Sequence, residues 1–157
     1  MASFSSTVPP DGGAARSAPP PVPRESGAPG TSSLRVFLVE DSPLVRERLN
    51  DFLAEPGKVE MIGYAETEVD AVREILARSV DVAIVDLNLK EGSGIGVIES
   101  VRARCTSAPP TIIVLTNYAF PEFAAACLER GADYFFDKST QFGAVKLLLD
   151  SILRRAN

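Results

Sequence analysis

The sequence of 157 residues contains no histidine, no tryptophan and only two cysteines, Cys105 and Cys127. Without histidine, the chain has no imidazole to act as a general base, as a zinc ligand or as a phosphorylated side chain. Ser-His-Asp and Cys-His catalysis within one chain are therefore excluded. The two cysteines lack the spacing of a metal site or of a disulfide framework, which is typical of a reducing, cytoplasmic compartment. Any chemistry must use carboxylates, lysine, hydroxyl groups, a thiol or a bound metal.

Long apolar runs and an excess of positive charge are also missing. No run approaches the roughly 20 apolar residues that a membrane helix needs, and the N-terminus lacks the apolar segment of a secretory signal. The 16 Lys and Arg residues are outnumbered by 21 Asp and Glu residues, which gives a net charge of −5. An acidic chain is poorly suited to binding nucleic acid through a broad basic surface. We therefore expect a cytoplasmic protein without direct DNA binding or membrane attachment.

The first 33 residues differ from the rest of the chain in composition. Pro, Ser, Ala and Gly dominate this stretch, and it shows neither a helical nor an alternating apolar period. Such a segment cannot bury enough apolar area to offset its conformational entropy. We predict a disordered tail over residues 1–33 and one folded domain over residues 34–157. A partner-binding Pro-rich motif and a misassigned start codon are the alternatives for the tail.

From Leu34 onward, short apolar runs alternate with stretches of helical apolar period. The runs have strand length and few polar residues, which indicates strands buried on both faces of a parallel sheet. Ser42 and Thr67 are suited to cap helices, and the stripes that follow them include Leu44 and Val69. We expect strands at residues 34–39, 59–65, 82–87, 111–116 and 132–136. We expect helices from residue 42 to before 56, from 67, over about 95–104, between 121 and 131, and over about 140–154.

Five βα units predict an α/β domain with a flavodoxin-like, doubly wound sheet, (βα)5, of five parallel strands in the order 2-1-3-4-5. In such a sheet, ligands bind beyond the carboxyl ends of the strands. Glu40 and Asp41 follow the first strand, Asp86 ends the third, Thr116 ends the fourth, and Lys138 follows the fifth closely. We expect three carboxylates, a hydroxyl group and an amine to face one crevice.

Carboxylates that lie this close repel one another unless a cation is present. Mg²⁺ takes hard oxygen ligands, and the main-chain carbonyl of Asn88 could supply a further oxygen. One carboxylate could then attack phosphorus and form an aspartyl phosphate, with Thr116 and Lys138 beside the phosphoryl oxygens. Each residue alone also has an ordinary structural explanation, such as an acidic helix start or a solvated lysine. The joint pattern at four strand ends is what favours a phosphoryl-transfer site.

Residues 34–154 resemble the receiver domain of bacterial two-component response regulators. The matching segments are VFLVEDSPLVRERL, VAIVDLNLKEGSGIGVIE, TIIVLT and GADYFFDKS. Asp86 precedes Thr116 by 30 residues and Lys138 by 52 residues, and both spacings fit this family. The resemblance covers nearly all of the predicted folded domain.

The resemblance implies a role for each residue of the crevice. Asp86 would accept the phosphoryl group. Glu40 and Asp41 would hold Mg²⁺ together with Asp86 and the main-chain carbonyl of Asn88. Lys138 would pair with a phosphoryl oxygen. The acidic pair is Glu-Asp where many members have Asp-Asp, and a glutamate should still support the metal.

The resemblance also implies a conformational switch. Thr116 would bind the phosphoryl group and move toward it, and Phe135, at the family's aromatic switch position, would rotate inward. Strand alternation and the distance from Thr116 favour Phe135 over Tyr134 for this role. The signal would then leave through the surface of the fourth helix, the fifth strand and the fifth helix.

The expected partners follow from the same resemblance. Because the chain has no histidine, the phosphoryl donor would be a sensor histidine kinase or a phosphotransfer protein. The chain stops soon after the last predicted helix, so we expect a stand-alone receiver that contacts an unidentified protein target, or a second copy in a phosphorylation-dependent homodimer. It would not be an enzyme, beyond promoting its own phosphorylation and dephosphorylation.

Two other classes of function remain. A Mg²⁺-dependent phosphatase with an aspartate nucleophile is disfavoured, because Asn88 stands where such enzymes carry a second aspartate. A phosphate-independent binding module with a receiver fold is the main alternative, and failure to bind Mg²⁺ would favour it.

Overall fold

The structure is a computed structural model that describes residues 32–156. Five strands and five helices alternate along this part of the chain: β1 (Leu34–Val39), α1 (Pro43–Leu53), β2 (Val59–Ala65), α2 (Glu68–Ala77), β3 (Val82–Val85), α3 (Gly94–Arg104), β4 (Thr111–Thr116), α4 (Pro121–Glu129), β5 (Tyr134–Asp137) and α5 (Phe142–Ala156). The strands form one parallel sheet in the order β2-β1-β3-β4-β5. The predicted flavodoxin-like fold and strand order are confirmed.

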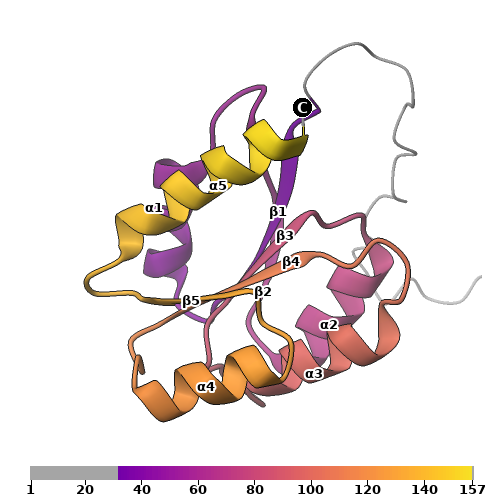
Figure 1. Ribbon diagram of the computed structural model, residues 1–157, viewed down its shortest axis with the longest axis vertical. Coiled ribbons are helices and arrows are strands. Elements are labelled where there is room, and N and C mark those ends of the chain that lie inside the picture. Colours follow the sequence, from indigo (N-terminus) through magenta and orange to yellow (C-terminus); the bar gives the residue numbers. More distant parts are fainter. Residues whose placement is uncertain (1–31, 157) are drawn as a thin grey trace, which may run out of the picture.

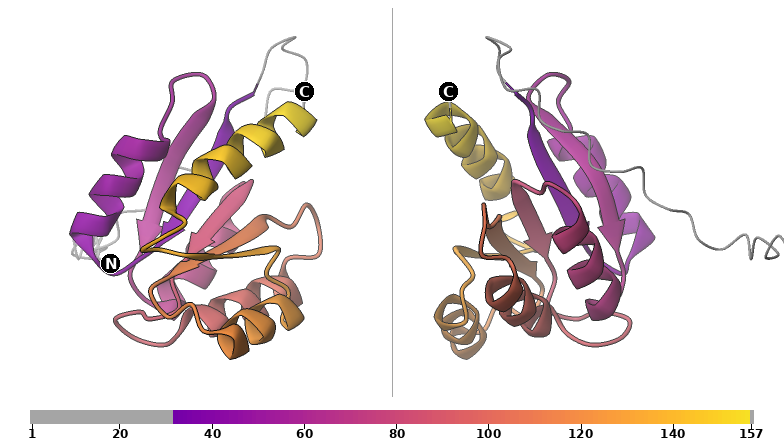
Figure 2. Two further views of the ribbon diagram at one scale, coloured as in Figure 1. Left: turned by 60° about the vertical axis from the view of Figure 1, so that its left-hand side comes forward. Right: turned by 90° about the vertical axis from the view of Figure 1, so that its right-hand side faces the viewer.

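The sheet is covered on both faces, with α1 and α5 on one side and α2, α3 and α4 on the other (Figure 1, Figure 2). Successive side chains of a strand point to opposite faces. In β1, Phe37 and Val39 accordingly pack in the core under α2, α3 and α4, whereas Val36 and Leu38 pack in the core under α1 and α5. The near absence of polar residues in the strands reflects these two cores.

The first two helices begin where the capping residues predict. Ser42 Oγ accepts a hydrogen bond from Val45 N at 3.3 Å, and Thr67 Oγ1 accepts one from Asp70 N at 3.2 Å. Each bond satisfies a main-chain N–H that the first turn of a helix leaves without a partner. Pro43 occupies the first turn of α1, where its missing N–H costs nothing.

The apolar stripes of these helices are narrower than expected. Leu44 is 65% exposed and Val69 is 71% exposed, so neither belongs to the core. The buried face of α1 is set by Leu49, one turn further along. In α2, Ala71 and Ile75 are buried, and they turn the helix so that Val69 faces outward.

Two strand boundaries also differ from the prediction. β3 ends at Val85, so Asp86 begins the loop that follows the strand. β5 starts two residues later than expected, because the end of α4 extends into that region: Ala132 N donates to Cys127 O at 2.9 Å. Gly131 makes this closure possible with a φ of 117°, a conformation that favours glycine.

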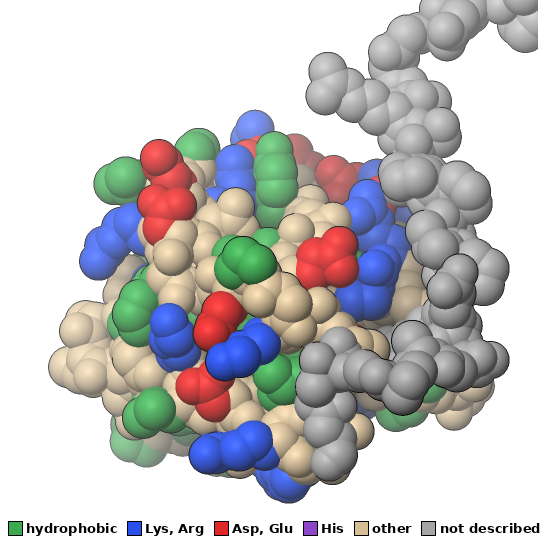
Figure 3. All heavy atoms as spheres, turned by 90° about the horizontal axis from the view of Figure 1, so that it is seen from above, with side chains coloured by type: hydrophobic (Ala, Val, Ile, Leu, Met, Phe, Trp, Pro, Cys, Tyr) green, Lys and Arg blue, Asp and Glu red, His purple; other side chains and the backbone are tan. Residues whose placement is uncertain are grey.

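The outer surface is mixed in character. Side chains of both charges and scattered hydrophobic side chains intermingle on the face seen in Figure 3. Within residues 32–156, no helix is long and apolar enough to cross a membrane. The tail predicted over residues 1–33 lies outside the described residues except for its last two, so that domain division stays a prediction.

Candidate functional site

Three carboxylates meet where β1 and β3 end. Glu40 and Asp41 follow β1, and Asp86 follows β3, its neighbour in the sheet. One carboxylate oxygen from each residue lies within 4.8 Å of the other two. Glu40 is 3% exposed and Asp86 is 7% exposed, whereas Asp41 is half-buried. The parallel sheet thus brings together the three acidic residues singled out in the sequence.

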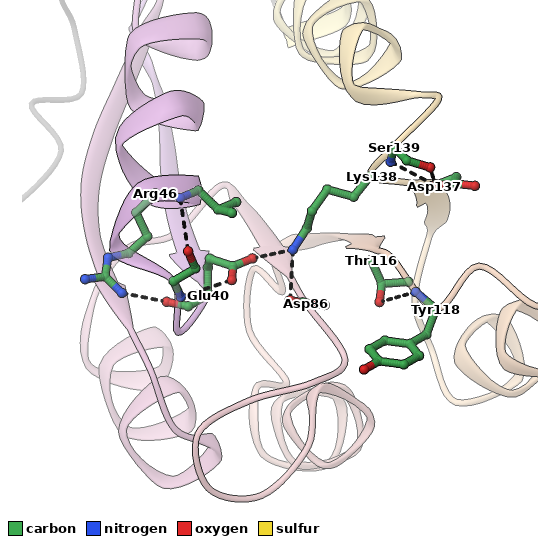
Figure 4. Close-up of polar contacts among 10 residues, drawn as sticks. Glu40, Arg46, Asp86, Thr116, Tyr118, Asp137, Lys138 and Ser139 are labelled. Atoms are coloured by element: carbon green, nitrogen blue, oxygen red, sulfur yellow. Dashed lines mark hydrogen bonds and ion pairs between the residues drawn. The ribbon is translucent and has the colours of Figure 1, made fainter.

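Lys138 reaches into this cluster from the end of β5. Its Nζ lies 2.7 Å from Glu40 Oε2 and 2.9 Å from Asp86 Oδ2 (Figure 4). The loop around it is closed by Ser139, whose N and Oγ both donate to Asp137 Oδ1, at 2.9 and 2.6 Å. One buried cation therefore bridges two buried carboxylates. Without this pairing, each of the buried charges would carry a large desolvation cost.

Burial and pairing act in opposite directions on these groups. Burial lowers the pKa of Lys138, but its hydrogen bonds and charge interactions with Glu40 and Asp86 outweigh burial, so its pKa is raised and the amine stays charged. Burial raises the pKa of Glu40 above its usual value, more than the bond from Lys138 lowers it. The negative charge of Asp86 acts in the same direction as burial. Burial and the neighbouring carboxylate thus both disfavour the charged form of Glu40, even with Lys138 in place.

Asp86 carries the feature that fits a further cation. Its Oδ2 is bound by Lys138, but its buried Oδ1 has no hydrogen-bond partner among residues 32–156. A buried carboxylate oxygen without a partner is costly. The oxygen donors of Glu40, Asp41 and Asp86 are the hard ligands that Mg²⁺ prefers. The residues present therefore fit a Mg²⁺ site.

Asn88 lies two residues beyond Asp86 and is exposed. It pairs with Ser93 in an isolated antiparallel bridge, and Gly94 N donates to Leu87 O at 3.0 Å. Gly94 sits directly against the main chain of Asp86, where a Cβ atom would have no room. The loop therefore folds back onto Asp86, and the ligand role of the Asn88 carbonyl stays a prediction.

Thr116 ends β4 at the same edge of the sheet and is fully buried. Its Oγ1 accepts a hydrogen bond from Tyr118 N at 3.1 Å (Figure 4). Phe135 is half-buried against the core under α2, α3 and α4, while Tyr134 and Phe136 pack on the opposite side of the sheet. This is the alternation on which the choice of Phe135 rested, and the switching roles of Thr116 and Phe135 stay predictions.

Two residues beside the cluster were not singled out in the sequence. Arg46 Nη1 donates to the main-chain oxygen of Glu40 at 2.9 Å and to Glu66 Oε1 at 3.0 Å. The guanidinium also lies 3.9 Å from the ring centroid of Tyr64. A signal for Glu66 was present, because it directly follows β2 and so belongs to the same carboxyl edge. Arg46 carries no such signal, since a helical arginine is most often a solvated residue.

Comparison with known proteins bears on this arrangement. The family model of the response regulator receiver domain matches residues 36–150. A cyclic di-GMP phosphodiesterase of Thermotoga maritima is 31% identical over 121 residues, which cover 77% of this chain and 31% of that protein. A protein-glutamate methylesterase/protein-glutamine glutaminase of Myxococcus xanthus is 30% identical over 116 residues, covering 74% of this chain and 33% of that protein. The chain thus spans about a third of the length of these two relatives.

Solved structures share the fold. The receiver domain of a response regulator NarL from Mycobacterium tuberculosis superposes with a TM-score of 0.70 at 24% identity, covering 78% of this chain and 98% of that one. At this identity, the similarity speaks for the fold alone.

Proposed function

The chain belongs to the response regulator receiver domain family, and from that premise we propose that Asp86 is the residue that accepts the phosphoryl group. Phosphoacceptor signalling is the function of this family in two-component systems. The observation that carries the assignment is the buried Oδ1 of Asp86, which has no hydrogen-bond partner among residues 32–156 and lies in the carboxylate cluster beside Lys138.

The proposed reaction is a transfer between two side chains. An Asp86 carboxylate oxygen forms a bond to phosphorus while the phosphorus–nitrogen bond of a partner's phosphohistidine breaks, and the imidazole leaves with the electron pair and takes up a proton. Lys138, already 2.9 Å from Asp86 Oδ2, holds the acceptor carboxylate in place and offers its charge to a phosphoryl oxygen. Thr116 offers a hydroxyl group from the end of the adjacent strand β4.

Receiver domains bind Mg²⁺ at an acidic pocket, and we propose that Glu40, Asp41, Asp86 and the Asn88 carbonyl hold the ion in this chain. When bound, Mg²⁺ supplies positive charge that offsets the charge of the carboxylates and of the transferred phosphoryl group. Both oxygens of the Glu40 carboxylate are held by the chain itself: Ser42 N donates to Oε1 at 3.1 Å, and Lys138 Nζ donates to Oε2.

The signal would leave through α4, β5 and α5. Phosphorylation would draw Thr116 away from Tyr118 N, Phe135 would turn inward, and the populations of two conformations would shift. We propose a sensor histidine kinase or phosphotransfer protein as the donor. We propose a protein target, or a second phosphorylated copy, as the acceptor of the signal, a choice that the net charge of −5 supports over DNA.

We further propose that the chain works in the cytoplasm as a phosphoacceptor and not as an enzyme with a separate substrate. Cys105 and Cys127 are unpaired in the described residues, which agrees with a reducing compartment.

The phosphoacceptor assignment is tested by intact mass spectrometry after incubation with acetyl phosphate and Mg²⁺. The wild-type chain should gain about 80 Da, the mass of one phosphoryl group, and should lose this gain when Mg²⁺ is chelated. The Asp86→Asn variant should fold and remain unlabelled. The matched control, Asp51→Asn, changes an exposed carboxylate on α1 and should be labelled normally. Persistent labelling of Asp86→Asn would disprove the assignment.

A further inference from the structure

A cation beside the carboxylate cluster contacts none of the three clustered carboxylates. Arg46 is a largely buried side chain, 13% exposed, on the first turn and a half of α1. Its Nη1 carries two hydrogens and donates two hydrogen bonds, one to Glu40 O and one to Glu66 Oε1. The flat guanidinium lies against the Tyr64 ring, which fixes its orientation. Figure 4 shows Arg46 reaching Glu40 from α1, on the side away from Lys138.

Arg46 and Lys138 bind different parts of Glu40. Lys138 binds the side chain of Glu40, whereas Arg46 binds its main chain. Glu40 N donates to Ala65 O at 3.0 Å, so the peptide groups on either side of Glu40 are both tied down. Because the next residue is Asp41, anchoring the Glu40 carbonyl fixes the direction from which both acidic side chains leave the chain.

Glu66 extends this anchor to the loop that carries Asn88. Lys90 N donates to Glu66 O at 3.1 Å, and Lys90 Nζ lies 4.0 Å from Glu66 Oε2. Three segments of the carboxyl edge, the starts of α1 and α2 and the loop after β3, are thus joined through one glutamate. Arg46 is the member of this set that also binds the acidic pair's own main chain.

We propose that Arg46 is a positioning residue for the metal site: clamped by Glu66 and Tyr64, it holds the Glu40 carbonyl and thereby sets the geometry of Glu40 and Asp41 for a divalent cation. The proposal deepens the proposed function, since it rests on the same carboxylates binding Mg²⁺. It assigns Arg46 no contact with the metal or with the phosphoryl group.

The sign of the effect on Mg²⁺ affinity separates positioning from simple electrostatics. If Arg46 acted only through its charge, removing it would strengthen Mg²⁺ binding, because a cation near an acidic cluster repels another cation. If it positions the carboxylates, removing it weakens binding. Loss of a residue that orients metal ligands typically costs at least about tenfold in affinity, so we expect the Kd for Mg²⁺ to rise roughly tenfold in Arg46→Gln.

The experiment titrates the full chain with MgCl2 and follows amide chemical shifts by NMR, which also reports whether each variant is folded. The matched control is Arg48→Gln, which removes the same charge from an exposed position on the same helix. It should bind Mg²⁺ as the wild type does, or slightly more tightly. Arg46→Lys keeps the charge but not the flat, two-directional donor, and it should still bind more weakly than the wild type.

Labelling by acetyl phosphate gives the second readout. At saturating Mg²⁺, Arg46→Gln should be labelled at close to the wild-type rate, because the defect is in affinity. A Kd for Arg46→Gln equal to or below that of Arg48→Gln, or a labelling rate still depressed at saturation, would overturn the proposal. If the wild-type chain itself bound no Mg²⁺, the proposed function would fail, a result distinct from a wild type that binds while Arg46→Gln binds equally well.

Discussion

On one side of the sheet's carboxyl edge charged side chains hold one another, and on the other side aromatic rings lie partly exposed. The charged half consists of Glu40, Arg46, Glu66, Asp86 and Lys138, which are joined by hydrogen bonds and ion pairs of 2.7–3.0 Å to one another or to the main chain of Glu40. These bonds link α1 and the ends of β1, β2, β3 and β5. Such a network fixes charge in space, which is what a site for a cation requires.

The aromatic half consists of Thr116, Tyr118, Phe120 and Phe123, in and after β4. Tyr118, Phe120 and Phe123 are between 38% and 53% exposed, and the rings of Phe120 and Phe123 are 5.9 Å apart. Tyr118 and Phe123 border a hollow of about 330 Å³ that extends to the loop after Asp86, where Leu87, Asn88, Ser93 and Ile95 complete its lining. Exposed rings beside open space can change position at lower cost than a buried ionic network.

The helix starts on the two sides differ in the same way. Ser42 caps α1 with a side-chain bond to Val45 N, whereas Phe120 precedes α4 without any side-chain cap bond. Rigidity at this edge of the sheet is therefore local. The charged half, which we propose to bind metal, is held by several hydrogen bonds and ion pairs. The aromatic half, which we propose to move on phosphorylation, has few polar bonds.

The largest expected effect comes from breaking the charged half at its centre. Lys138→Met removes the cation between two buried carboxylates, and the free energy of unfolding should fall by about 3 kcal/mol without Mg²⁺. Adding Mg²⁺ should recover part of this loss, because the ion supplies charge to the same carboxylates. Urea unfolding with and without Mg²⁺ measures both effects. Lys58→Met, at an exposed ion pair with Glu55, is the control and should change stability by less than about 1 kcal/mol. Equal stability of the two variants would contradict the comparison.

A smaller effect is expected from the buried hydroxyl group of the aromatic half. Thr116→Val removes the acceptor for Tyr118 N and should lower the free energy of unfolding by about 1 kcal/mol. Thr116→Ser keeps the acceptor and serves as the control for that bond. Neither variant should alter Mg²⁺ affinity, since Thr116 lies outside the carboxylate cluster. A Mg²⁺ Kd that changed as much as in Arg46→Gln would show that the two halves are not independent.

A still smaller effect is expected from giving α4 the side-chain cap that α1 has. Phe120 has the extended backbone of a helix-capping residue, with φ −84° and ψ 145°. Phe120→Asp should therefore raise the free energy of unfolding, by about 0.5 kcal/mol. Phe120→Ala, which removes the ring without adding an acceptor, is the control. If both variants had the same stability, the missing cap would not be what leaves this half less constrained.

Much of the fold could be predicted because short local patterns, apolar runs and helix-capping residues, mark its elements. The apolar runs gave the bounds of β1, β2 and β4, and Ser42 and Thr67 marked the helix starts. The exposure of Leu44 and Val69 could not be predicted in this way. A stripe of large apolar residues does not show which face packs when small residues such as Ala71 fill the contact with the sheet.

The candidate site shows a similar division. Glu40, Asp41, Asp86, Thr116 and Lys138 could be grouped because parallel strands end at one edge. The roles of Arg46 and Glu66 depend on a contact between residues 20 positions apart on different elements. No local pattern encodes that contact, since it is set by how α1 packs beside β2. The pairing of Lys138 with both Glu40 and Asp86 likewise needed the tertiary structure.

The bridge made by Lys138 has a consequence for how the molecule folds. Its partners lie 98 and 52 residues earlier in the chain, so the bridge is a contact of very high sequence separation. Closing such long loops has a high entropic cost, so we expect this bridge to form late in folding. Until β5 docks, Glu40 and Asp86 have no internal cation, and a divalent ion would have the greatest effect on the last stage of assembly. Because the proposed metal ligands follow β1 and β3, Mg²⁺ bound there would stabilise the sheet by mass action before β5 docks, supplying positive charge in place of Lys138.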